Sequence, residues 1–523
     1  MNYRSARQSQ PDRKAPFMIT QDQAEVVAFL SAPHVRGADK VEIIETHISC
    51  IFLSGDRAYK MKRAVKLPYV DFSTAELRLA ACEKEVALNS ATAPGLYLGV
   101  RRIMRGRDGR LSFDKGDELV DAAIEMVRFD QAALFDRMAV GGKLDAELMA
   151  RTARMIARFH KGAKIVHQGP GSANIAAVLR INAAGFATSR LFDPVELADF
   201  EQAFERNLVA YAPLLDAREA AGKVRRCHGD LHLRNICLLN GEPRLFDCIE
   251  FNDQIATIDT LYDLAFLLMD LWHRGFPQFA NLVMNRYLDE SGDEDGFVLL
   301  PYFMAIRAAV RAHVTATQIE ESGERSDALA VEARSYFDLA LFLLEKRSPR
   351  LIVIGGLSGS GKTTVSEILA AQIGSPPGAR IIESDRIRKA MYGVVAETRL
   401  SADAYRPEIS EKVYGEMACR TFSILRAGGS VVAEAVFDKF ANRQRIEAAA
   451  SEAHVPYTAI WLDASPSVLR GRVAERTAGP SDADLNVLCR QLAYDVGDLD
   501  WHRMDADRSA DNIVADILKL SRD

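Results

Sequence analysis

The chain has 523 residues, a formal net charge of −6, 48% hydrophobic residues and 26% charged residues. This length is too great for a single core and fits about two to four domains. The composition is that of soluble globular proteins, and the slightly acidic balance argues against a protein that coats nucleic acid. The seven cysteines form no CxxC pair, so we expect no disulfide framework and no zinc site, but reduced thiols in a cytoplasmic protein.

Neither end of the chain nor its interior predicts a membrane protein. Residues 1–16 are polar and basic and lack the apolar core of a secretory signal, so we expect a disordered tail. The most apolar helical run, LYDLAFLLMDLW at 261–272, is interrupted by Asp263 and Asp270. It is also shorter than the roughly 20 residues of a membrane span, so we expect no membrane helix.

Hydrophobic periodicity and turn residues divide the rest of the chain in two. The first part, 17–345, begins with β segments and continues as helix, which predicts a small β-rich lobe followed by a larger helical lobe. Its expected elements are short strands within 41–62 around a turn at 54–56, a helix at 76–88, a strand at 122–129, and helical stretches at 148–160, 194–215 and 301–344.

A charged, proline-containing linker at 346–350 separates this domain from a second one at 351–523. In the second domain short apolar strands alternate with helical segments, which predicts an α/β fold with a parallel sheet. The expected strands are 351–355, 380–383, 430–433 and 457–462.

The second domain opens with a phosphate-binding motif. Residues 356–363, GLSGSGKT, fit GxxxxGK[ST] between an apolar strand and a helix-forming run. The glycines let backbone amides surround a phosphate, Lys362 supplies charge toward the β- and γ-phosphates, and the Thr363 hydroxyl can bind magnesium. The motif therefore predicts a site for ATP and Mg²⁺. Its predicted nucleotide-binding residues are Gly356, Ser358, Gly359, Ser360, Gly361, Lys362, Thr363 and Thr364.

Further candidates follow the later strands of this domain. Asp385 comes directly after a strand and is the predicted catalytic base for a substrate hydroxyl, with a helix N-cap as the alternative. Glu434 ends another strand, where its carboxylate is predicted to hold a magnesium-bound water. Arg472 and Arg476 share one helix face and suit closure over phosphates, although a solvated basic face paired with Glu475 is the alternative.

Most of 350–523 resembles the small P-loop kinases of the AAA_33 and zeta-toxin-like group, relatives of polynucleotide kinase and gluconate kinase. The resemblance rests on the phosphate loop, on SDRIRK at 384–389, and on Arg472 and Arg476 ahead of 480–491, which looks like the lid of that group. Glu434 departs from the aspartate that the group often has. Acidic residues slightly outnumber basic ones from 350 to 523, so a nucleic-acid acceptor is not favoured.

A second catalytic motif, HGDLHLRN at 228–235, lies in the first domain. It has the spacing of the kinase pattern HRDLxxxxN, in which an aspartate accepts the proton of the acceptor and an asparagine holds magnesium. Asp230 is therefore the predicted base and Asn235 a predicted metal ligand. Asp247 follows the next hairpin and is predicted to be the second metal ligand.

The remaining kinase parts are a lysine on the third strand and a glutamate on the following helix. AYK at 58–60 places Lys60 on the strand face that carries Ala58, and Lys62 on the same face is the runner-up. Glu85 is the predicted partner of the lysine, with Glu83 second; a solvated helix face is the alternative for both glutamates.

These residues make the chain from about 40 to 345 resemble the aminoglycoside phosphotransferase family of kinase-like enzymes. The family shares HGDLHxxN, a downstream metal aspartate and an LAxxH-like helix that matches 156–160. The resemblance implies a protein-kinase-like α+β fold and a hinge at Glu125 to Val127 that presents backbone groups to adenine. No GxGxxG precedes the third strand, and the family label does not establish antibiotic resistance, because fold does not fix substrate.

The order of the two domains resembles that of bifunctional aminoglycoside phosphotransferase/ATP-binding proteins. The leading hypothesis is a cytoplasmic tandem kinase with two ATP–Mg²⁺ sites, each phosphorylating a hydroxyl of a small molecule. Three alternatives stay open: one catalytic domain regulated by a nucleotide-sensing partner, an ATP-driven switch protein, and a nucleic-acid 5'-hydroxyl kinase. The sequence indicates no membrane partner, no particular acceptor and no particular oligomeric state.

Overall fold

The structure is a computed structural model that divides into two compact units. It describes residues 18–32, 41–46, 48–67, 70–322, 327–475, 479–493, 496–497 and 499–521, so the expected tail at 1–16 lies outside the described residues. The first unit comprises residues up to 141 together with 228–230 and 234–256. The second comprises 142–227, 231–233 and 257 onward.

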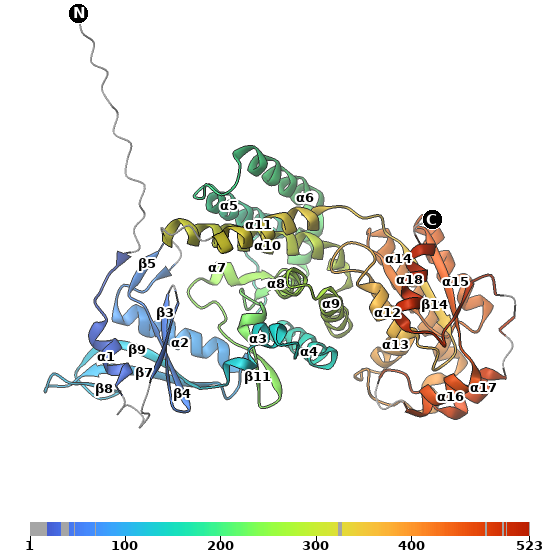
Figure 1. Ribbon diagram of the computed structural model, residues 1–523, viewed down its shortest axis with the longest axis horizontal. Helices are drawn as coiled ribbons and strands as arrows, with labels where there is room; N and C mark the ends of the chain where they lie inside the picture. The colour runs from blue at the N-terminus through green and yellow to red at the C-terminus, as the bar shows by residue number, and fades with distance from the viewer. Residues whose placement is uncertain are drawn as a thin grey trace, which may run out of the picture. The chain divides into compact units, whose positions relative to one another are not determined.

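The first unit is built on a six-stranded antiparallel sheet of order β2-β3-β4-β9-β7-β8. The helix α2 runs across one face of this sheet and packs on it through Cys82, Leu79 and Val86 (Figure 1). Helix α1 packs on the other face through Val26 and Leu30. The bounds are α1 Ala24–Ser31, β2 Glu42–Glu45, β3 Ser49–Ser54, β4 Arg57–Lys62, α2 Ala75–Thr92, β7 Tyr97–Arg105, β8 Leu111–Phe113 and β9 Glu118–Val127.

Smaller elements complete the first unit. A three-stranded sheet of order β1-β5-β6 and the antiparallel hairpin β11–β12 lie outside the main sheet. Their bounds, with those of the short helices, are β1 Met18–Ile19, β5 Val65–Leu67, β6 Val70–Asp71, η2 Gln131–Ala133, α3 Phe135–Val140, η3 Leu233–Asn235, β11 Ile236–Leu239, β12 Glu242–Leu245 and α7 Asp253–Ala256. The segment η3 begins at Leu233 in the second unit and continues into the first.

Local sequence accounts for the main elements of the first unit. The predicted strands within 41–62 are confirmed as β2, β3 and β4, and the turn between β3 and β4 places Gly55 at a positive φ of 56°. The predicted helix at 76–88 is confirmed as α2, whose N-cap Thr74 accepts a hydrogen bond from the Leu77 N–H. The predicted strand at 122–129 is confirmed as β9, although it begins earlier and ends at Val127.

The second unit contains a helical region and a parallel sheet. The helical region carries α4 and α6 where helices are predicted at 148–160 and 194–215. The predicted stretch at 301–344 is two helices rather than one, α10 and α11. The bounds are α4 Ala146–Gly162, α5 Gly171–Phe186, α6 Pro194–Ala220, β10 Val224–Arg226, β13 Thr257–Asp259, α8 Thr260–His273, α9 Pro277–Ser291, η4 Glu294–Leu299, α10 Leu300–Ser322 and α11 Asp327–Leu344.

One helical stretch of the described residues, 294–320, is long and apolar enough by length and composition to cross a membrane. In this structure 72% of its apolar window is buried inside the protein, which is the situation of a core helix in a globular protein. The predicted run at 261–272 is likewise buried almost throughout, as part of α8. Apolar composition in these helices is therefore accounted for by packing within the unit.

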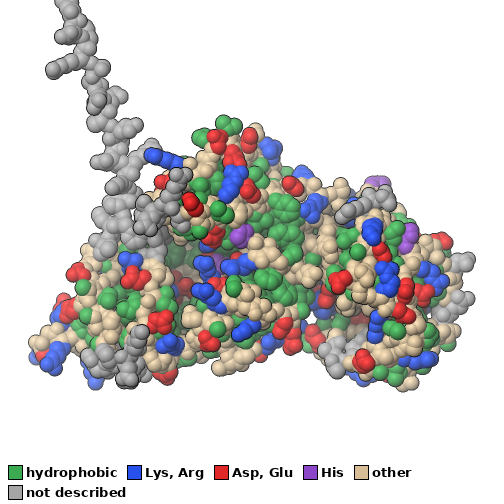
Figure 2. Space-filling model, viewed as in Figure 1, with side chains coloured by type: hydrophobic (Ala, Val, Ile, Leu, Met, Phe, Trp, Pro, Cys, Tyr) green, Lys and Arg blue, Asp and Glu red, His purple; other side chains and the backbone are tan. Residues whose placement is uncertain are grey.

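Charged side chains of both signs are mixed on one face of the protein. Figure 2 shows Lys and Arg side chains interspersed with Asp and Glu side chains on the face drawn there. The mixed surface agrees with the formal net charge of −6.

The parallel sheet of the second unit has the order β15-β16-β14-β17-β18. All four predicted strands are confirmed, and β18 is an edge strand that the sequence reasoning missed. The strands are β14 Leu351–Gly356, β15 Arg380–Glu383, β16 Val431–Glu434, β17 Tyr457–Asp463 and β18 His502–Asp505. The helices are α12 Lys362–Ala370, α13 Ser384–Met391, η5 Ala402–Tyr405, α14 Pro407–Arg426, α15 Phe440–Glu452, α16 Pro466–Glu475, α17 Leu485–Leu492 and α18 Ala510–Leu520.

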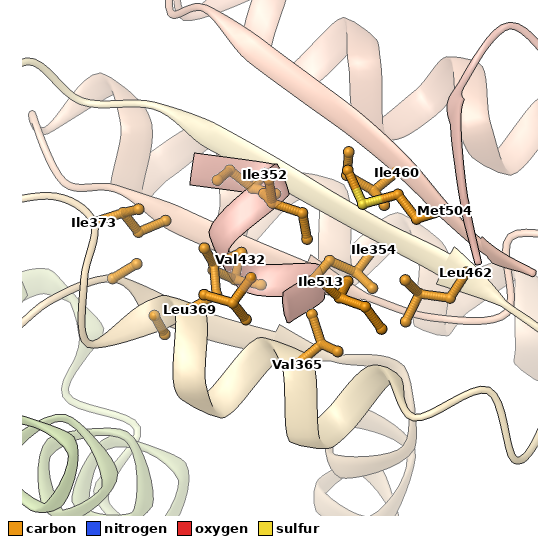
Figure 3. Close-up of a cluster of buried hydrophobic side chains, with 14 of the residues drawn as sticks. Ile352, Ile354, Val365, Leu369, Ile373, Val432, Ile460, Leu462, Met504 and Ile513 are labelled. Atoms are coloured by element: carbon orange, nitrogen blue, oxygen red, sulfur yellow. The ribbon is translucent and has the colours of Figure 1, made fainter. Parts of the chain in front are cut away.

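A dry core fixes the start of the phosphate loop. Ile352 and Ile354 on β14 pack against Val365 and Leu369 on α12, and Ile513 on α18 closes the same cluster (Figure 3). Burial of each such side chain contributes roughly 1.5–3 kcal/mol. The strand and helix on either side of the phosphate loop are thereby held in place by apolar packing.

Arg218 of the second unit is a buried charge whose removal tests how the helical region is held together. It donates to Asp259 at 2.7 and 2.8 Å and to Asp293 at 2.7 and 2.9 Å. We expect Arg218→Met to lower the free energy of unfolding by ~3–5 kcal/mol, because two buried carboxylates lose their partner. Tryptophan fluorescence during urea unfolding measures this, since Trp272, Trp461 and Trp501 all lie in the second unit.

The matched control is Arg508→Met, which breaks an exposed pair with Asp516 and should cost less than ~1 kcal/mol. Equal unfolding midpoints for the two variants would contradict the assignment of Arg218 as a buried anchor.

Candidate active sites

Two lysines of β4 share one buried glutamate in the first unit. Lys60 and Lys62 lie two residues apart, so the strand places both side chains on one face. Glu85 of α2 accepts from Lys60 at 2.8 Å through Oε1 and from Lys62 at 2.5 Å through Oε2. Lys60 also pairs with Asp247, and Lys62 also pairs with Glu250. The result is an alternating row of charges with Glu85 at its centre.

Charge pairing favours the ionised forms of Lys60 and Asp247 in spite of burial. Burial lowers the pKa of Lys60, but Asp247 and Glu85 outweigh it and raise that pKa well above its ordinary value. Burial acts to raise the pKa of Asp247, but the Lys60 ammonium outweighs it and lowers that pKa. At Glu250 burial dominates and raises the pKa, even though Lys62 acts in the opposite direction.

The loop with the HGDLHLRN motif brings Asp230 and Asn235 together. The Asn235 side-chain amide donates to Asp230 Oδ2 and to the Asp230 carbonyl, both at 2.9 Å. The Phe246 N–H donates to the Asn235 carbonyl at 3.1 Å, which ties the loop to the strand end that carries Asp247. His228 lies within hydrogen-bond distance of the Phe246 carbonyl, at 2.9 Å from Nε2, and so has a structural partner.

Asp247 sits in an uncommon backbone conformation. Its φ is 63°, in the left-handed region that non-glycine residues seldom adopt. Its N–H donates to the Tyr97 hydroxyl at 3.1 Å, and the neighbouring Cys248 N–H donates to Asn89 Oδ1 at 3.0 Å. Such conformations persist where the surroundings hold them, and they concentrate at functional sites.

The predicted hinge at Glu125 to Val127 lies at the end of strand β9 and stays a prediction, although one of its backbone donors is already used. Strand β9 lies between β4 and β7, so Glu125 is paired in register with Tyr59 on one side and Gly99 on the other. The Val127 N–H donates to the Leu96 carbonyl at 2.9 Å. That donor is therefore already used within the protein, and the chain leaves the sheet only after Val127.

The residues predicted for the first site fall into two groups whose members contact one another. The structure brings the predicted residues Lys60, Glu85 and Asp247 into contact, and Asp230 with Asn235. Glu83, the second choice for the lysine partner, is exposed and pairs with Arg102. The sequence reasoning missed Glu250 and Tyr97, since neither belongs to a motif.

The phosphate loop of the second unit has the backbone that its glycines permit. Gly356, Gly359 and Gly361 have φ values of 145°, 87° and 90°, which L side chains rarely adopt. A Cβ added at Gly359 would also lie 2.7 Å from the Leu469 carbonyl oxygen. The other predicted loop residues, Ser358, Ser360 and Thr364, lie in the same segment around Lys362.

The loop borders a cavity of 960 Å³ in the second unit. The Lys362 ammonium donates to the Leu357 carbonyl at 3.0 Å, and Thr363 donates to Glu434 Oε1 at 2.7 Å. The cavity is lined by three groups of predicted residues: the loop, Asp385 and Glu434, and Arg472. The predicted members of the lining are Ser358, Gly359, Gly361, Lys362, Thr363, Thr364, Asp385, Glu434 and Arg472.

Three carboxyl groups gather at the ends of β15 and β16. Glu383 and Glu434 are paired in register on these parallel strands, and Asp385 follows at the start of α13. Burial, and then the charge of Glu434, raise the pKa of Glu383 to about 8. Burial also raises the pKa of Asp385, although Arg388 and Lys362 act against it. The sequence reasoning missed Glu383 as a member of this cluster.

The donor atoms at both sites fit a divalent cation. Glu434 Oε2 is buried near the Ser366 hydroxyl, but neither atom has a hydrogen-bond partner within the described part of the chain. Together with the Thr363 hydroxyl it offers the oxygen ligands that magnesium prefers. In the first unit Asn235 donates through its side-chain nitrogen, so its side-chain oxygen, like the carboxylate of Asp247, is of the type that binds magnesium.

Arg472 and the predicted lid close one side of the cavity. Arg472 donates to the Ala506 carbonyl at 3.0 Å, whereas Arg476 lies outside the described residues. In the lid, Gln491 accepts from the Ser358 N–H at 3.0 Å, and Asp482 accepts from Lys389 and from the Tyr405 hydroxyl, each at 2.6 Å. Asp482 and Gln491 belong to the predicted lid at 480–491, whereas Tyr405 is a cavity residue that no motif had marked.

Two protein-family models match separate parts of this chain. Residues 116–297 match the model of the phosphotransferase enzyme family, and residues 351–495 match the model of an AAA domain, AAA_33. The chain carries a phosphotransferase-family domain and a P-loop kinase domain of the AAA_33 type. Its fold class is accordingly a kinase-like region followed by an α/β P-loop domain with a five-stranded parallel sheet, as predicted.

The chain is similar over most of its length to "Uncharacterized protein Rv2004c" of Mycobacterium tuberculosis. The two are 28% identical over 479 residues, which cover 89% of this chain and 92% of that protein. Among solved structures it is similar to a choline/ethanolamine kinase family protein from Mesorhizobium loti, with 16% identity, a TM-score of 0.40, and coverage of 61% of this chain and 93% of that one. A gluconokinase from Sinorhizobium meliloti is 26% identical, with a TM-score of 0.24, and coverage of 34% of this chain and 94% of that one.

Glu85 and Glu83 provide a matched test of the charge row in the first unit. We expect Glu85→Gln to lower the free energy of unfolding of this unit by ~3–5 kcal/mol, because two buried lysines lose a shared partner. Glu83→Gln, on the same helix but exposed, should change it by less than ~0.5 kcal/mol. Differential scanning calorimetry measures both, and equal transition temperatures would contradict the role of Glu85.

Glu383 makes the stability of the second unit depend on pH. Its folded pKa of about 8 lies above the ordinary value of 4.5, so the unfolded state loses this proton first as pH rises. Its contribution to stability is therefore present below pH 4.5 and lost as pH rises toward 8. We expect Glu383→Gln to become progressively more stable than the parent protein across this range, as measured by urea midpoints from tryptophan fluorescence.

The control for this pH experiment is Glu452→Gln, an exposed position on α15. A parent protein and a Glu383→Gln variant whose midpoints change with pH in parallel would disprove the assignment.

Proposed function

We propose that this chain is an ATP-dependent tandem phosphotransferase whose two sites each transfer the γ-phosphate of ATP to a hydroxyl group of a small molecule. One observation carries the proposal: each compact unit gathers a candidate base, a lysine and metal-binding oxygens within one site. In the first unit these are Asp230, Lys60 and the pair Asn235 and Asp247. In the second they are Asp385, Lys362 and the pair Thr363 and Glu434.

At the first site the chain's own groups divide the work of phosphoryl transfer. Lys60, held by Glu85, is positioned to neutralise phosphate oxygens, as the strand lysine of kinases does. Asp230 accepts the proton of the acceptor hydroxyl while that oxygen attacks the γ-phosphorus, and the bond to the ADP oxygen breaks. The hydrogen bonds from Asn235 keep the Asp230 carboxylate in a fixed orientation for this step.

At the second site the phosphate loop and Lys362 bind the nucleotide phosphates, and Asp385 takes the proton of the acceptor. The raised pKa of Asp385 makes its carboxylate a stronger proton acceptor than an exposed aspartate. Arg472 lines the same cavity and is placed to neutralise charge on the transferring phosphoryl group. Arg476 stays a prediction.

Mg²⁺ bound to Asn235 and Asp247, and to Thr363 and Glu434, would supply positive charge on the phosphates at each site. These four residues would hold and orient the cation, but they do not supply its positive charge.

A small-molecule acceptor fits the second site better than a nucleic acid. The cavity of 960 Å³ falls within the range of small-ligand pockets, about 300–1,000 Å³, before any nucleotide is placed in it. The mixed surface charge in Figure 2 lacks the character of a backbone-binding stripe on the face drawn. We therefore favour a small metabolite with a free hydroxyl.

The test begins with the number of binding sites for a non-hydrolysable magnesium–ATP analogue, counted by calorimetry. We expect two sites per chain in the parent protein, and one each in Lys362→Ala and Asp247→Ala, because each change removes phosphate or metal contacts from one unit. Asp230→Asn and Asp385→Asn should keep both binding events, since neither side chain is assigned to the nucleotide.

Transfer is then followed with γ-labelled ATP and a panel of hydroxyl-bearing small molecules. Each aspartate variant should lose label transfer to the acceptors of its own site only, by on the order of 10²–10⁴-fold. The exposed variants Lys519→Ala and Asp253→Ala are the matched controls for charge. A single analogue site, lost only in Lys362→Ala, would reject the tandem function and leave the first unit as a module without catalysis.

A further inference from the structure

Helix α9 belongs to the helical region, yet it presents a polar stripe to the phosphate-loop domain within the second unit. Asn281, Asn285 and Asp289 follow one another at intervals of four residues, so they lie on one face of the helix. Asn281 and Asn285 are buried. Buried amide side chains are costly unless they are hydrogen-bonded, so their partners identify what the helix is built to hold.

The partners are the backbone groups at the edge of the parallel sheet. Strand β15 is an edge strand, since it is hydrogen-bonded only to β16 within the sheet. Asn285 Oδ1 accepts from the Ile381 N–H at 2.8 Å, and its amide donates to the Ala379 carbonyl at 3.2 Å. Asn281 donates to the carbonyls of Pro377 and Ala379 at 3.1 and 3.0 Å. Helix α9 thus satisfies an edge that an open sheet would leave unpaired.

Asp289 extends this contact to both ends of β15, because Arg380 is the first residue of that strand and Arg386 follows it, while Arg286 lies on α9 itself. It accepts from Arg380 at 2.6 Å and from Arg286 at 3.0 Å, and its Oδ2 lies 3.6 Å from Arg386. Burial acts to raise the pKa of Asp289, but the three guanidinium groups outweigh it and lower that pKa to about 2. Asp289 therefore stays charged as the common partner of groups on three elements.

Two of these arginines lead directly to the elements that carry the proposed chemistry. Arg386 immediately follows Asp385 and donates to Glu383 Oε2 at 2.9 Å, which fixes the turn between β15 and α13. Arg286 donates to Glu367 at 2.6 Å, on the helix α12 that begins at Lys362. A single helix outside the phosphate-loop domain is thus bonded to both the base-bearing turn and the phosphate-binding helix.

We infer that α9 holds the strand edge and the turn on which the phosphate-loop site depends, and that Asp289 is a positioning residue for Asp385. This inference rests on the proposed function of Asp385 as the base. Asp289 touches neither nucleotide nor acceptor; it acts through Arg386 and Arg380, which set where β15 ends and where α13 begins. The phosphate-loop domain as delimited by sequence, 351–523, therefore lacks one element of its own site.

The experiment uses the full chain in an Asp230→Asn background, so that the remaining ATP turnover, measured with water as acceptor, comes from the phosphate loop. A Lys362→Ala variant verifies this origin. We expect Asp289→Asn to lower kcat by on the order of ten- to a hundredfold, with KM for magnesium–ATP within about twofold, because the base is misplaced while the phosphate loop is intact. Asp289→Glu should recover most of kcat.

Hydrogen exchange of the segment 379–391 gives a second readout that needs no catalysis. Asp289→Asn should speed exchange there by at least about tenfold, since the strand edge and turn lose a fixed partner. The matched control is Glu290→Gln, which removes the same charge from the next residue of α9 but contacts Arg158 instead. This control should leave kcat, KM and exchange unchanged.

The outcomes separate this inference from the proposed function. Unchanged kcat and unchanged exchange in Asp289→Asn would overturn the inference, as would equal effects of Asp289→Asn and Glu290→Gln. If no turnover depends on Lys362, the proposed function of this site fails, and exchange alone decides the structural claim. If Asp289→Asn does not fold, Arg386→Gln breaks the contacts of Arg386 with Glu383 and with Asp289 but leaves Arg380 and Arg286 in place, and full kcat in that variant would overturn the inference.

Discussion

Opposite charge stabilises the buried lysines of the first candidate site and the arginines beside the second, and both sites depend on this pairing. A lysine in a protein interior keeps its proton only if nearby carboxylates repay the loss of water. Glu85 meets this need for Lys60 and Lys62 at once, one through each carboxylate oxygen. Asp289 plays the same part for the three arginines Arg286, Arg380 and Arg386. Removal of Glu85 or Asp289 would leave several positive charges together in a poorly solvated part of the protein.

Pairing also decides what each charged group can do. Lys60 pairs with Asp247 in this structure. In the proposed function a phosphate would therefore compete with Asp247 for Lys60, and a metal ion would compete with Lys60 for Asp247. The Asp230 carboxylate accepts a hydrogen bond from the Asn235 side-chain amide, which orients it. At the other site burial raises the pKa of Glu383, Glu434 and Asp385, and the charge of Glu434 adds to this effect at Glu383. One family of interactions thus yields both firmly ionised and readily protonated carboxylates.

Backbone constraints set the second level of organisation. The phosphate loop requires positive φ at Gly356, Gly359 and Gly361, and the core of Ile352, Ile354, Val365 and Leu369 holds the strand and helix that the loop connects. The edge of β15 requires hydrogen-bond partners, which α9 supplies from an earlier part of the chain. A domain boundary predicted from composition does not include this contact. The Asn281 and Asn285 side chains of α9 lie about 100 residues before β15 in the sequence.

The sequence by itself determined the elements whose signals are local. The glycines and Lys362 of the phosphate loop, the spacing of Asp230 and Asn235, the helix at α2 and four of the five strands of the parallel sheet all follow from short motifs, caps or periodicity. Tertiary structure alone decided which glutamate pairs with Lys60, that Lys62 shares it, that Glu383 joins Glu434, and that the Val127 N–H is taken by Leu96. The physical reason is that burial, pairing and hydrogen-bond competition arise between residues far apart along the chain, and no local pattern records them.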